Sequence, residues 1–267
     1  MANGLTLTEL NTRRATLKKK LADQKRVFAS WICFGHPSIA EILSRSGVDF
    51  IGIDLEHTVI SLEQARDIIS ACQATGTLCL PRISSHNASE IKRLLDAGAD
   101  GIIAPTVETA EQAEELVSYC RYAPHGKRGF GISRGQGYGF DFDEYITNWK
   151  DVSTLIVQIE TVKGVENIDA ILAVDGVDGA MIGPYDLSGS LGVPGQLDHP
   201  KVAEATGTMI AACQKASKAS GPHIVNPGKE EIEEAFAKGF SFVVLGADMF
   251  AFWKWSEQLS ETIENLD

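Results

Sequence analysis

Charged and polar residues end several short apolar runs of this sequence, and each run has the composition of a buried strand. These residues are Asp54, Glu56 and His57 after the second run, Arg82 after the third, Gln158 and Glu160 at the end of the fifth, and Asp186 after the sixth. Burying a charge is costly unless the charge is paired or bound to a metal. Such a concentration of charges favours a functional site, with a set of structural ion pairs as the alternative.

Glu160 and Asp186 are the candidate metal ligands. Hard divalent cations such as Mg²⁺ and Mn²⁺ prefer carboxylate oxygens and keep several water ligands. Two carboxylates from neighbouring strands would therefore leave positions open for a chelating substrate. The alternative is that Glu160 forms an ion pair with Arg82 or Lys163 and that no metal binds.

His57 is the candidate general acid or base, because histidine is the side chain that changes charge near neutral pH. Asp54 or Glu56 could fix its tautomer, and a purely structural histidine is the alternative. Arg82 would stabilise a developing oxyanion, since its charge is permanent and its donors have a fixed geometry. The alternative for Arg82 is a structural salt bridge.

The turn Gly183-Pro184 precedes Asp186. It would expose backbone N–H groups that can bind a carboxylate in a small concave nest. The alternative is a plain tight turn.

One structural unit recurs along the chain: a helix with apolar periodicity, a glycine, and a short apolar strand. The copies are at 41–54, 90–105, 168–184 and 231–246. Together with other apolar runs they predict eight strands, at 27–33, 49–54, 77–82, 101–104, 154–160, 178–183, 222–226 and 241–245. Regular alternation of strands and helices predicts a parallel sheet, and eight units favour a closed (β/α)8 TIM barrel over an open doubly wound sheet. Barrel active sites lie at the carboxyl ends of the strands, so the polar residues above should meet at one mouth.

Residues 1–267 are expected to form a single barrel domain. Residues 1–25, where basic residues are scattered among leucines, predict an extra N-terminal surface helix whose basic side chains face solvent. Residues 248–267 predict a C-terminal helix. The glycine-rich stretch 123–150 is predicted to be a lid or binding loop at the carboxyl side of a strand.

The formal net charge of −12 argues against a nucleic-acid partner. No apolar run approaches the roughly 18 residues of a membrane span, and the N-terminus has no apolar core of a signal peptide. The five cysteines form no C-x-x-C pair, which is typical of buried thiols in a reducing compartment. We therefore expect a cytoplasmic protein without a membrane partner.

Six segments, taken in order, resemble the HpcH/HpaI aldolase family over about residues 27–250. They are FIGIDLEHTVI, LPRISSHN, GADGIIAPTVETAEQAEELV, YAPHGKRGFG, VQIETVKGVENIDAI and GAMIGPYDLSGSLG. Members of this family are metal-dependent (class II) pyruvate aldolases. The resemblance implies a divalent cation, Mg²⁺, Mn²⁺ or Co²⁺, held by Glu160 and Asp186.

The resemblance also implies roles for the remaining residues. His57 with Asp54 and Glu56 would be the acid/base group, and Arg82 would steady a pyruvate enolate. The implied substrate-binding residues are Gln158, Gly183, Pro184, Tyr185, Asp186 and Trp31. Backbone amides near Tyr185 and Asp186 would hold the pyruvate carboxylate. The family further implies a homo-oligomer, a hexamer built as a trimer of dimers, with the C-terminal helix swapped between barrels.

The expected reaction is reversible aldol cleavage of a 4-hydroxy-2-oxo acid, of the 2-keto-3-deoxy-sugar-acid type, to pyruvate and an aldehyde. One alternative is a citrate-lyase-like acyl-CoA lyase, for which Lys127, Arg128 and Arg134 are the available basic residues. Another is a non-catalytic barrel that binds a keto acid. The chain departs from the family pattern at Tyr185, at Phe34-Gly35-His36 and at 132–141, all of which are predicted to surround the aldehyde half of the pocket.

Overall fold

The computed structural model describes residues 5–266 of the 267-residue chain. Residues 1–4 of the predicted N-terminal helix and residue 267 of the predicted C-terminal helix lie outside this range. The strands are β1 (Val27–Ile32), β2 (Phe50–Ile53), β3 (Leu78–Cys79), β4 (Gly101–Ala104), β5 (Thr154–Ile159), β6 (Gly179–Ile182), β7 (Ala219–Gly221), β8 (His223–Ile224) and β9 (Phe242–Leu245).

Helices alternate with the strands along the chain. They are α1 (Leu7–Ala22), α2 (Pro37–Leu43), η1 (Ser44–Ser46), α3 (Leu62–Thr75), α4 (Ala88–Asp96), α5 (Ala110–Cys120), η2 (Arg134–Gly139), α6 (Phe142–Val152), α7 (Val162–Glu166), α8 (Ile168–Leu172), α9 (Pro184–Ser190), α10 (Pro200–Ala216), α11 (Lys229–Ala237) and α12 (Asp248–Glu264).

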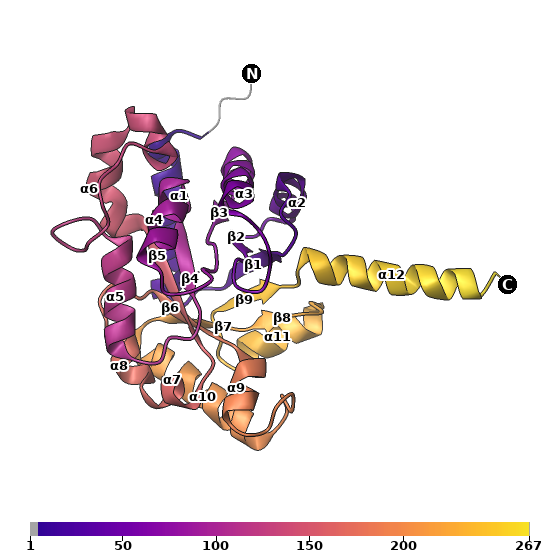
Figure 1. The fold of residues 1–267 in the computed structure, drawn as a ribbon. Coiled ribbons are helices and arrows are strands. Elements are labelled where there is room, and N and C mark those ends of the chain that lie inside the picture. Colours follow the sequence, from indigo (N-terminus) through magenta and orange to yellow (C-terminus); the bar gives the residue numbers. More distant parts are fainter. Residues whose placement is uncertain (1–4, 267) are drawn as a thin grey trace.

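All strand pairs are parallel, in two sheets of order β3-β2-β1-β9-β8 and β4-β5-β6-β7. Backbone hydrogen bonds join the sheets at both junctions: Ile103 N donates to Pro81 O (2.9 Å), and Ser241 N donates to Ser220 O (2.8 Å). Helices surround these strands in Figure 1. The predicted (β/α)8-barrel fold class is confirmed.

The seventh predicted strand, 222–226, is divided in the structure. β7 pairs with β6, whereas β8 pairs with β9. Pro222 stands between β7 and β8, and a proline has no N–H to donate to a ladder. The division therefore falls where the backbone loses a donor.

Local sequence signals explain where several helices begin and end. Ser61 and Gln64 form a capping box at the start of α3, and Thr109 and Gln112 form another at the start of α5. After α4, Gly98 has a φ of +105°, which a residue without Cβ adopts at little cost. These ends fix where the following strands start.

Trp31 fills the inside of the barrel below its mouth. Its side chain is buried in an inner core with Phe50, Leu80 and Phe242. A Cβ atom on Gly52 would come within 2.4 Å of the Trp31 ring, so the indole lies directly on the backbone of β2. Only glycine at position 52 leaves room for it.

Helix α1 closes the amino-terminal end of the barrel, so the prediction of a solvated surface helix is wrong for its inner face. Leu17 and Leu21 are buried in the inner core with the barrel residues. Three basic residues of α1 form ion pairs with aspartates that directly precede strands: Arg14–Asp100 (2.7 Å), Lys18–Asp178 (2.8 Å) and Lys20–Asp49 (2.6 Å). Each aspartate also accepts a backbone N–H of a neighbouring strand, from Cys79, Leu155 and Phe28 respectively.

The glycine-rich stretch 123–150 also lies at this amino-terminal end, so its prediction as a loop on the carboxyl side of a strand is wrong. It follows helix α5 and precedes β5. Arg134 donates to the carbonyl oxygen of Ala97 (2.9 Å), at the end of α4, and α6 packs against α1. Residues 132–141 therefore lie away from the mouth formed by their own chain.

Helix α12 projects away from the barrel (Figure 1). Among its described residues, Asp248 alone is buried. Its exposed side carries Phe252, Trp255, Leu259 and Ile263, spaced as one helical face. Among residues 5–266, no helix combines the length and apolar character needed to cross a bilayer.

Candidate active site

Arg82 is the centre of a buried network at the carboxyl ends of β2, β3 and β5. Its Nε and Nη2 donate to the two carboxylate oxygens of Asp54, at 3.1 and 2.8 Å. Its Nη1 lies 3.4 Å from Gln158 Oε1 and 3.0 Å from Glu56 Oε2. Because these contacts hold the guanidinium along two of its edges, it cannot rotate and its charge has a fixed direction.

Asp54 also shapes the turn that carries His57. Its Oδ1 accepts the backbone N–H groups of Glu56 (3.1 Å) and His57 (3.2 Å). The His57 ring is instead near Glu56, with Nε2 3.6 Å from Oε2, and the side chain is 66% exposed. Of the two acids considered as partners of the imidazole, Glu56 is therefore the one within reach.

Glu56 is partly buried between charges of both signs. Burial raises the pKa of its carboxyl group, Arg82 opposes that rise, and the negative charge of Glu160 adds to it. Its Oε2 makes no well-formed hydrogen bond within the described chain, although it is close to Arg82. This oxygen is enclosed, and its nearest charged neighbour is the Arg82 guanidinium.

Glu160 is buried at the end of β5, and its carboxylate is held by uncharged donors. Thr106 donates to Oε1 through its backbone N–H (2.7 Å) and its hydroxyl (2.6 Å). The Gln158 amide donates to Oε2. The two ion pairs considered as alternatives do not form, because Arg82 contacts Asp54 and Glu56 while Lys163 pairs with Glu108 (3.4 Å).

Gly183 lets the backbone after β6 pass close to Glu160. A Cβ atom at this position would lie 2.5 Å from Glu160 Oε2 and 2.9 Å from the Gln158 amide nitrogen. Pro184 then starts helix α9, and the first helical bond runs from Leu187 N to Gly183 O. The N–H groups of Tyr185 and Asp186 precede that bond, and so have no acceptor inside the helix.

Asp186 is exposed in the first turn of α9, next to this glycine. Within residues 5–266, no three metal-binding side chains lie close enough together to form a complete protein cage. A buried carboxylate without a cationic partner is nevertheless costly. The donor set of Glu160 and Asp186 fits a hard divalent cation that completes its coordination with water or substrate oxygens.

Trp31 forms the floor of this mouth. The Arg82 guanidinium carbon lies 5.2 Å from the centroid of its ring. The centroid of the His223 ring lies 5.9 Å from the centroid of the Trp31 ring. Trp31 is 2% exposed, so a bound molecule would meet an edge of the indole at most.

Two residues of the mouth were not predicted from the sequence as site residues. Thr106 holds Glu160 from the loop after β4, and its φ of +49° is the one local sign of an unusual role. His223, on β8, has no spacing from the other histidines of the sequence that would indicate a metal site. Its role depends on neighbours that are distant in sequence.

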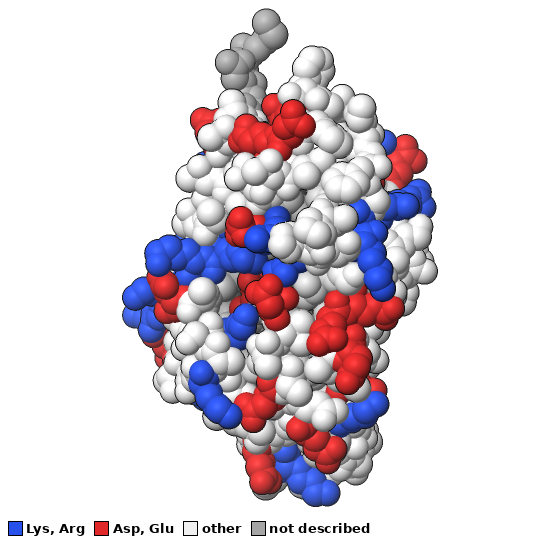
Figure 2. All heavy atoms as spheres, turned by 90° about the vertical axis from the view of Figure 1, so that its left-hand side faces the viewer, with Lys and Arg blue, Asp and Glu red and all other residues white. Residues whose placement is uncertain are grey.

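The basic residues considered for a nucleotide substrate lie elsewhere. Arg128 is buried, pairs with Asp96 (2.8 Å) and stacks on Tyr122. Arg134 contacts the end of α4, and Lys127 N donates to Ser118 O near the end of α5. Figure 2 shows the face of the molecule that carries α5 and α6, and on it basic and acidic side chains are interspersed. The expectation that 132–141 borders the aldehyde half of the pocket is wrong within one chain, although Tyr185 and Phe34 do lie at the mouth.

Comparisons with known proteins agree with this barrel fold. A family model described as HpcH/HpaI aldolase/citrate lyase matches residues 28–254. The chain is 39% identical over 235 residues to the hydroxypyruvate/pyruvate aldolase of Roseobacter denitrificans, covering 88% of this chain and 91% of that protein. It is 37% identical over 224 residues to the 2-keto-3-deoxy-L-rhamnonate aldolase of Klebsiella pneumoniae, covering 83% of each.

A solved structure of the same family has the same fold. The HpcH/HpaI aldolase from Desulfitobacterium hafniense superimposes with a TM-score of 0.85 at 32% identity, covering 94% of this chain and 97% of that one. The chain belongs to the HpcH/HpaI aldolase/citrate lyase family.

Proposed function

We propose that this chain is an aldehyde-lyase that reversibly cleaves a 4-hydroxy-2-oxo acid into a pyruvate-type 2-oxo acid and an aldehyde. The observation that carries the proposal is the fixed Arg82 guanidinium, linked through Gln158 to a buried Glu160 whose hydrogen-bond donors within residues 5–266 are uncharged. The family membership and the aldolases among its relatives support the same reaction.

Glu160 and Asp186 would hold the divalent cation, which when bound supplies Lewis-acid stabilisation of negative charge on the substrate oxygens. Mg²⁺, Mn²⁺ and Co²⁺ all suit two carboxylates and open positions, and Gln158 would keep Glu160 oriented. The free N–H groups of Tyr185 and Asp186 would bind the substrate carboxylate. Pro184 and Gly183 set the direction of those groups.

Arg82 would face the C2 oxygen and stabilise the enolate. In cleavage, His57 takes the proton of the C4 hydroxyl, either directly or through a water molecule. The C3–C4 bond breaks, its electron pair forms the enolate, and C4 leaves as the aldehyde. A proton then returns to C3 to give the methyl group of pyruvate. Glu56 lies near the His57 ring, where it orients the imidazole and stabilises the positive charge that the ring gains with the proton.

The two rival functions lack matching features. An acyl-CoA lyase would need cations near the mouth for nucleotide phosphates, whereas Arg128 and Arg134 are committed at the other end of the barrel. A binding barrel without chemistry would not need an exposed imidazole beside a partly buried carboxylate. Aldol cleavage is the reaction that uses Arg82, His57 and Glu160 together.

We also propose that each chain is one barrel domain and that copies assemble as a trimer of dimers. The exposed apolar face of α12 supports an oligomer, because side chains such as Trp255 and Leu259 would otherwise stay in water. Swapping α12 between two barrels would bury this face.

The proposal is tested by proton exchange at C3. Protein stripped of metal with a chelator is incubated with pyruvate in deuterated water, with and without Mg²⁺ or Mn²⁺, and the methyl proton signal is followed. We expect exchange that requires the metal. Absence of exchange with every divalent metal, in the presence and absence of an added aldehyde, would reject enolate formation and with it the aldolase proposal.

A further inference from the structure

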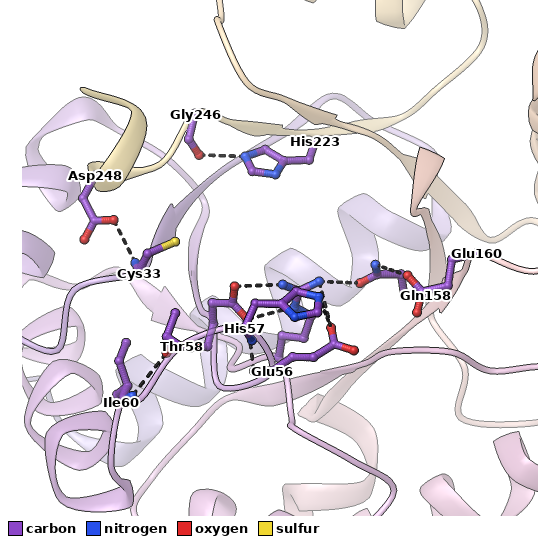
Figure 3. Close-up of polar contacts among 12 residues, drawn as sticks. Cys33, Glu56, His57, Thr58, Ile60, Gln158, Glu160, His223, Gly246 and Asp248 are labelled. Atoms are coloured by element: carbon purple, nitrogen blue, oxygen red, sulfur yellow. Dashed lines mark hydrogen bonds and ion pairs between the residues drawn. The ribbon is translucent and has the colours of Figure 1, made fainter. Parts of the chain in front are cut away.

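His223 is a buried titratable group at the mouth for which the proposed reaction has no use. It lies on β8, and its pairing with Val244 of β9 fixes its place in the barrel. Its ring is tilted against Trp31 at 5.9 Å and against Phe250 at 6.1 Å. Figure 3 shows the His223 imidazole beside Gly246, across an open space from His57 and Gln158.

The hydrogen bond to Gly246 defines which nitrogen of His223 carries a proton. Nε2 lies 3.0 Å from the Gly246 carbonyl oxygen, which can only accept, so Nε2 is the donor. Burial lowers the pKa of the imidazole, and the positive charge of Arg82 adds to that effect. The ring is thus neutral near pH 7, and its Nδ1 carries a lone pair.

Nδ1 accepts no hydrogen bond from any group in residues 5–266, and the His223 side chain is partly exposed. A neutral acceptor without a partner, placed in a substrate mouth, fits a hydroxyl group of the bound molecule. A carboxylate or phosphate does not fit, because those groups have no proton to donate. The chemistry of the missing partner is therefore a neutral hydroxyl.

The position of the ring indicates which substrate atom bears that hydroxyl. Trp31 lies close to both Arg82 and His223. If Arg82 faces the C2 oxygen, then C3, one bond away, is the substrate carbon nearest Trp31 and His223. The carboxylate would be directed instead toward the N–H groups at the start of α9, which follows β6.

We propose that His223 is a specificity-determining residue that selects 2-oxo-acid donors with a hydroxyl group on C3, through a hydrogen bond from that hydroxyl to Nδ1. This inference rests on the aldolase proposal above and deepens it. It assigns a preference for hydroxypyruvate over pyruvate as the enolate-forming partner to one residue of this chain.

Three variants separate the contribution of the Nδ1 acceptor of His223 from the contribution of its donor to Gly246 O. His223→Asn can place its side-chain oxygen near the position of Nδ1, while His223→Gln can keep a donor to Gly246 O but offers no acceptor there. His223→Leu keeps neither. For each variant, kcat/KM is measured for aldol addition of hydroxypyruvate and of pyruvate to the same aldehyde, with saturating Mn²⁺, and melting temperatures verify folding.

We expect the hydroxypyruvate-to-pyruvate ratio to fall about tenfold in the Leu and Gln variants, which is the factor that one neutral hydrogen bond supplies. The Asn variant should retain most of the preference. The ratio of C3–H exchange rates of the two acids in deuterated water should change in the same order, because exchange needs no aldehyde.

Other outcomes overturn the inference in distinguishable ways. A ratio in the Leu and Gln variants within twofold of the wild-type ratio would show that Nδ1 binds water or nothing. An Asn variant that behaves as the Leu variant would show that ring packing, not the acceptor, sets the preference. Wild-type protein that exchanges neither acid with any metal would reject the aldolase proposal itself, and a wild type that prefers pyruvate would reject the inference alone.

Discussion

Directional contacts fix the orientation of the Arg82 side chain, because two edges of its guanidinium contact Asp54, Glu56 and Gln158. We predict that Arg82→Lys, which keeps the charge, lowers kcat/KM for aldol cleavage at least about 100-fold, since a lysine cannot make the two-edged contact and loses the directed charge. Steady-state kinetics with a 4-hydroxy-2-oxo acid measure this. A loss of less than about fivefold would contradict the assigned role.

Glu160 is predicted to bind the metal through a carboxylate whose other contacts are uncharged. Glu160→Gln keeps the shape and the capacity to accept from Thr106, but removes the charge. We expect Mn²⁺ affinity to fall at least about tenfold, read by titration calorimetry without substrate. Glu108→Gln, which changes a carboxylate paired with Lys163, is the control and should bind Mn²⁺ as the wild type does. Equal affinities in both variants would reject Glu160 as a ligand.

His223 gives a pH-dependent prediction for stability. Its folded pKa is lowered by burial, so between that value and about 6.5 the unfolded chain binds more protons than the folded one. The wild type should therefore lose stability as pH falls through about 6.5. From pH 7.5 to pH 5.5, the melting temperature of the wild type should fall more than the melting temperature of His223→Asn. A difference that does not change with pH would mean that His223 titrates normally.

The sequence could predict these residues only in part. Charges at strand ends identify Asp54, Arg82 and Glu160, because a buried run that ends in a charge is a local pattern. Thr106 and His223 escape prediction, since each acquires a role from a residue on another strand. Hydrogen bonds between residues 54 or 23 positions apart leave no periodic signal.

At the scale of elements, the same limit applies to α1. The sequence pattern of basic residues and spaced leucines is the same whether the apolar face of the helix contacts water or the end of a barrel. Capping boxes and helix C-terminal glycines can be recognised in a sequence because each is complete within about four residues. The contact of Arg14 with Asp100 spans 86 positions and could not be predicted this way.

The buried pair of Arg14 and Asp100 predicts a large stability effect. Arg14→Met would leave the Asp100 carboxylate buried and unpaired, at a cost of about 3–5 kcal/mol in the free energy of unfolding. Adding Asp100→Asn should recover part of that loss. Lys19→Met, in the exposed pair with Asp23, should change stability by at most about 0.5 kcal/mol. Urea unfolding of the four proteins measures both effects, and equal losses for Arg14→Met and Lys19→Met would contradict the prediction.

For the whole molecule, the barrel has two ends with separate tasks. The amino-terminal end, with α1 and 123–150, is stabilised by buried ion pairs and aromatic stacking on Arg128. The carboxyl end carries the mouth. Strand–helix alternation predicted the barrel because that pattern covers the whole chain, but it could not assign the glycine-rich stretch to an end. The stretch 123–150 follows helix α5 and leads into β5, and a connection from a helix to the next strand lies at the amino-terminal end of the barrel.

Helix α12 belongs to neither end, and its exposed stripe makes the last prediction one about assembly. Phe252, Trp255, Leu259 and Ile263 are each 42–60% exposed in the single chain. Their burial in an oligomer is worth about 25 cal/mol for each Å² removed from water. We therefore expect the wild type to sediment as an oligomer, and a variant with Trp255→Ser and Leu259→Ser to shift toward smaller species at the same micromolar concentration. Lys254→Ser, on the same helix, should leave the sedimentation profile unchanged. A wild type that sediments as one chain would leave this stripe without a partner copy and would reject the trimer of dimers.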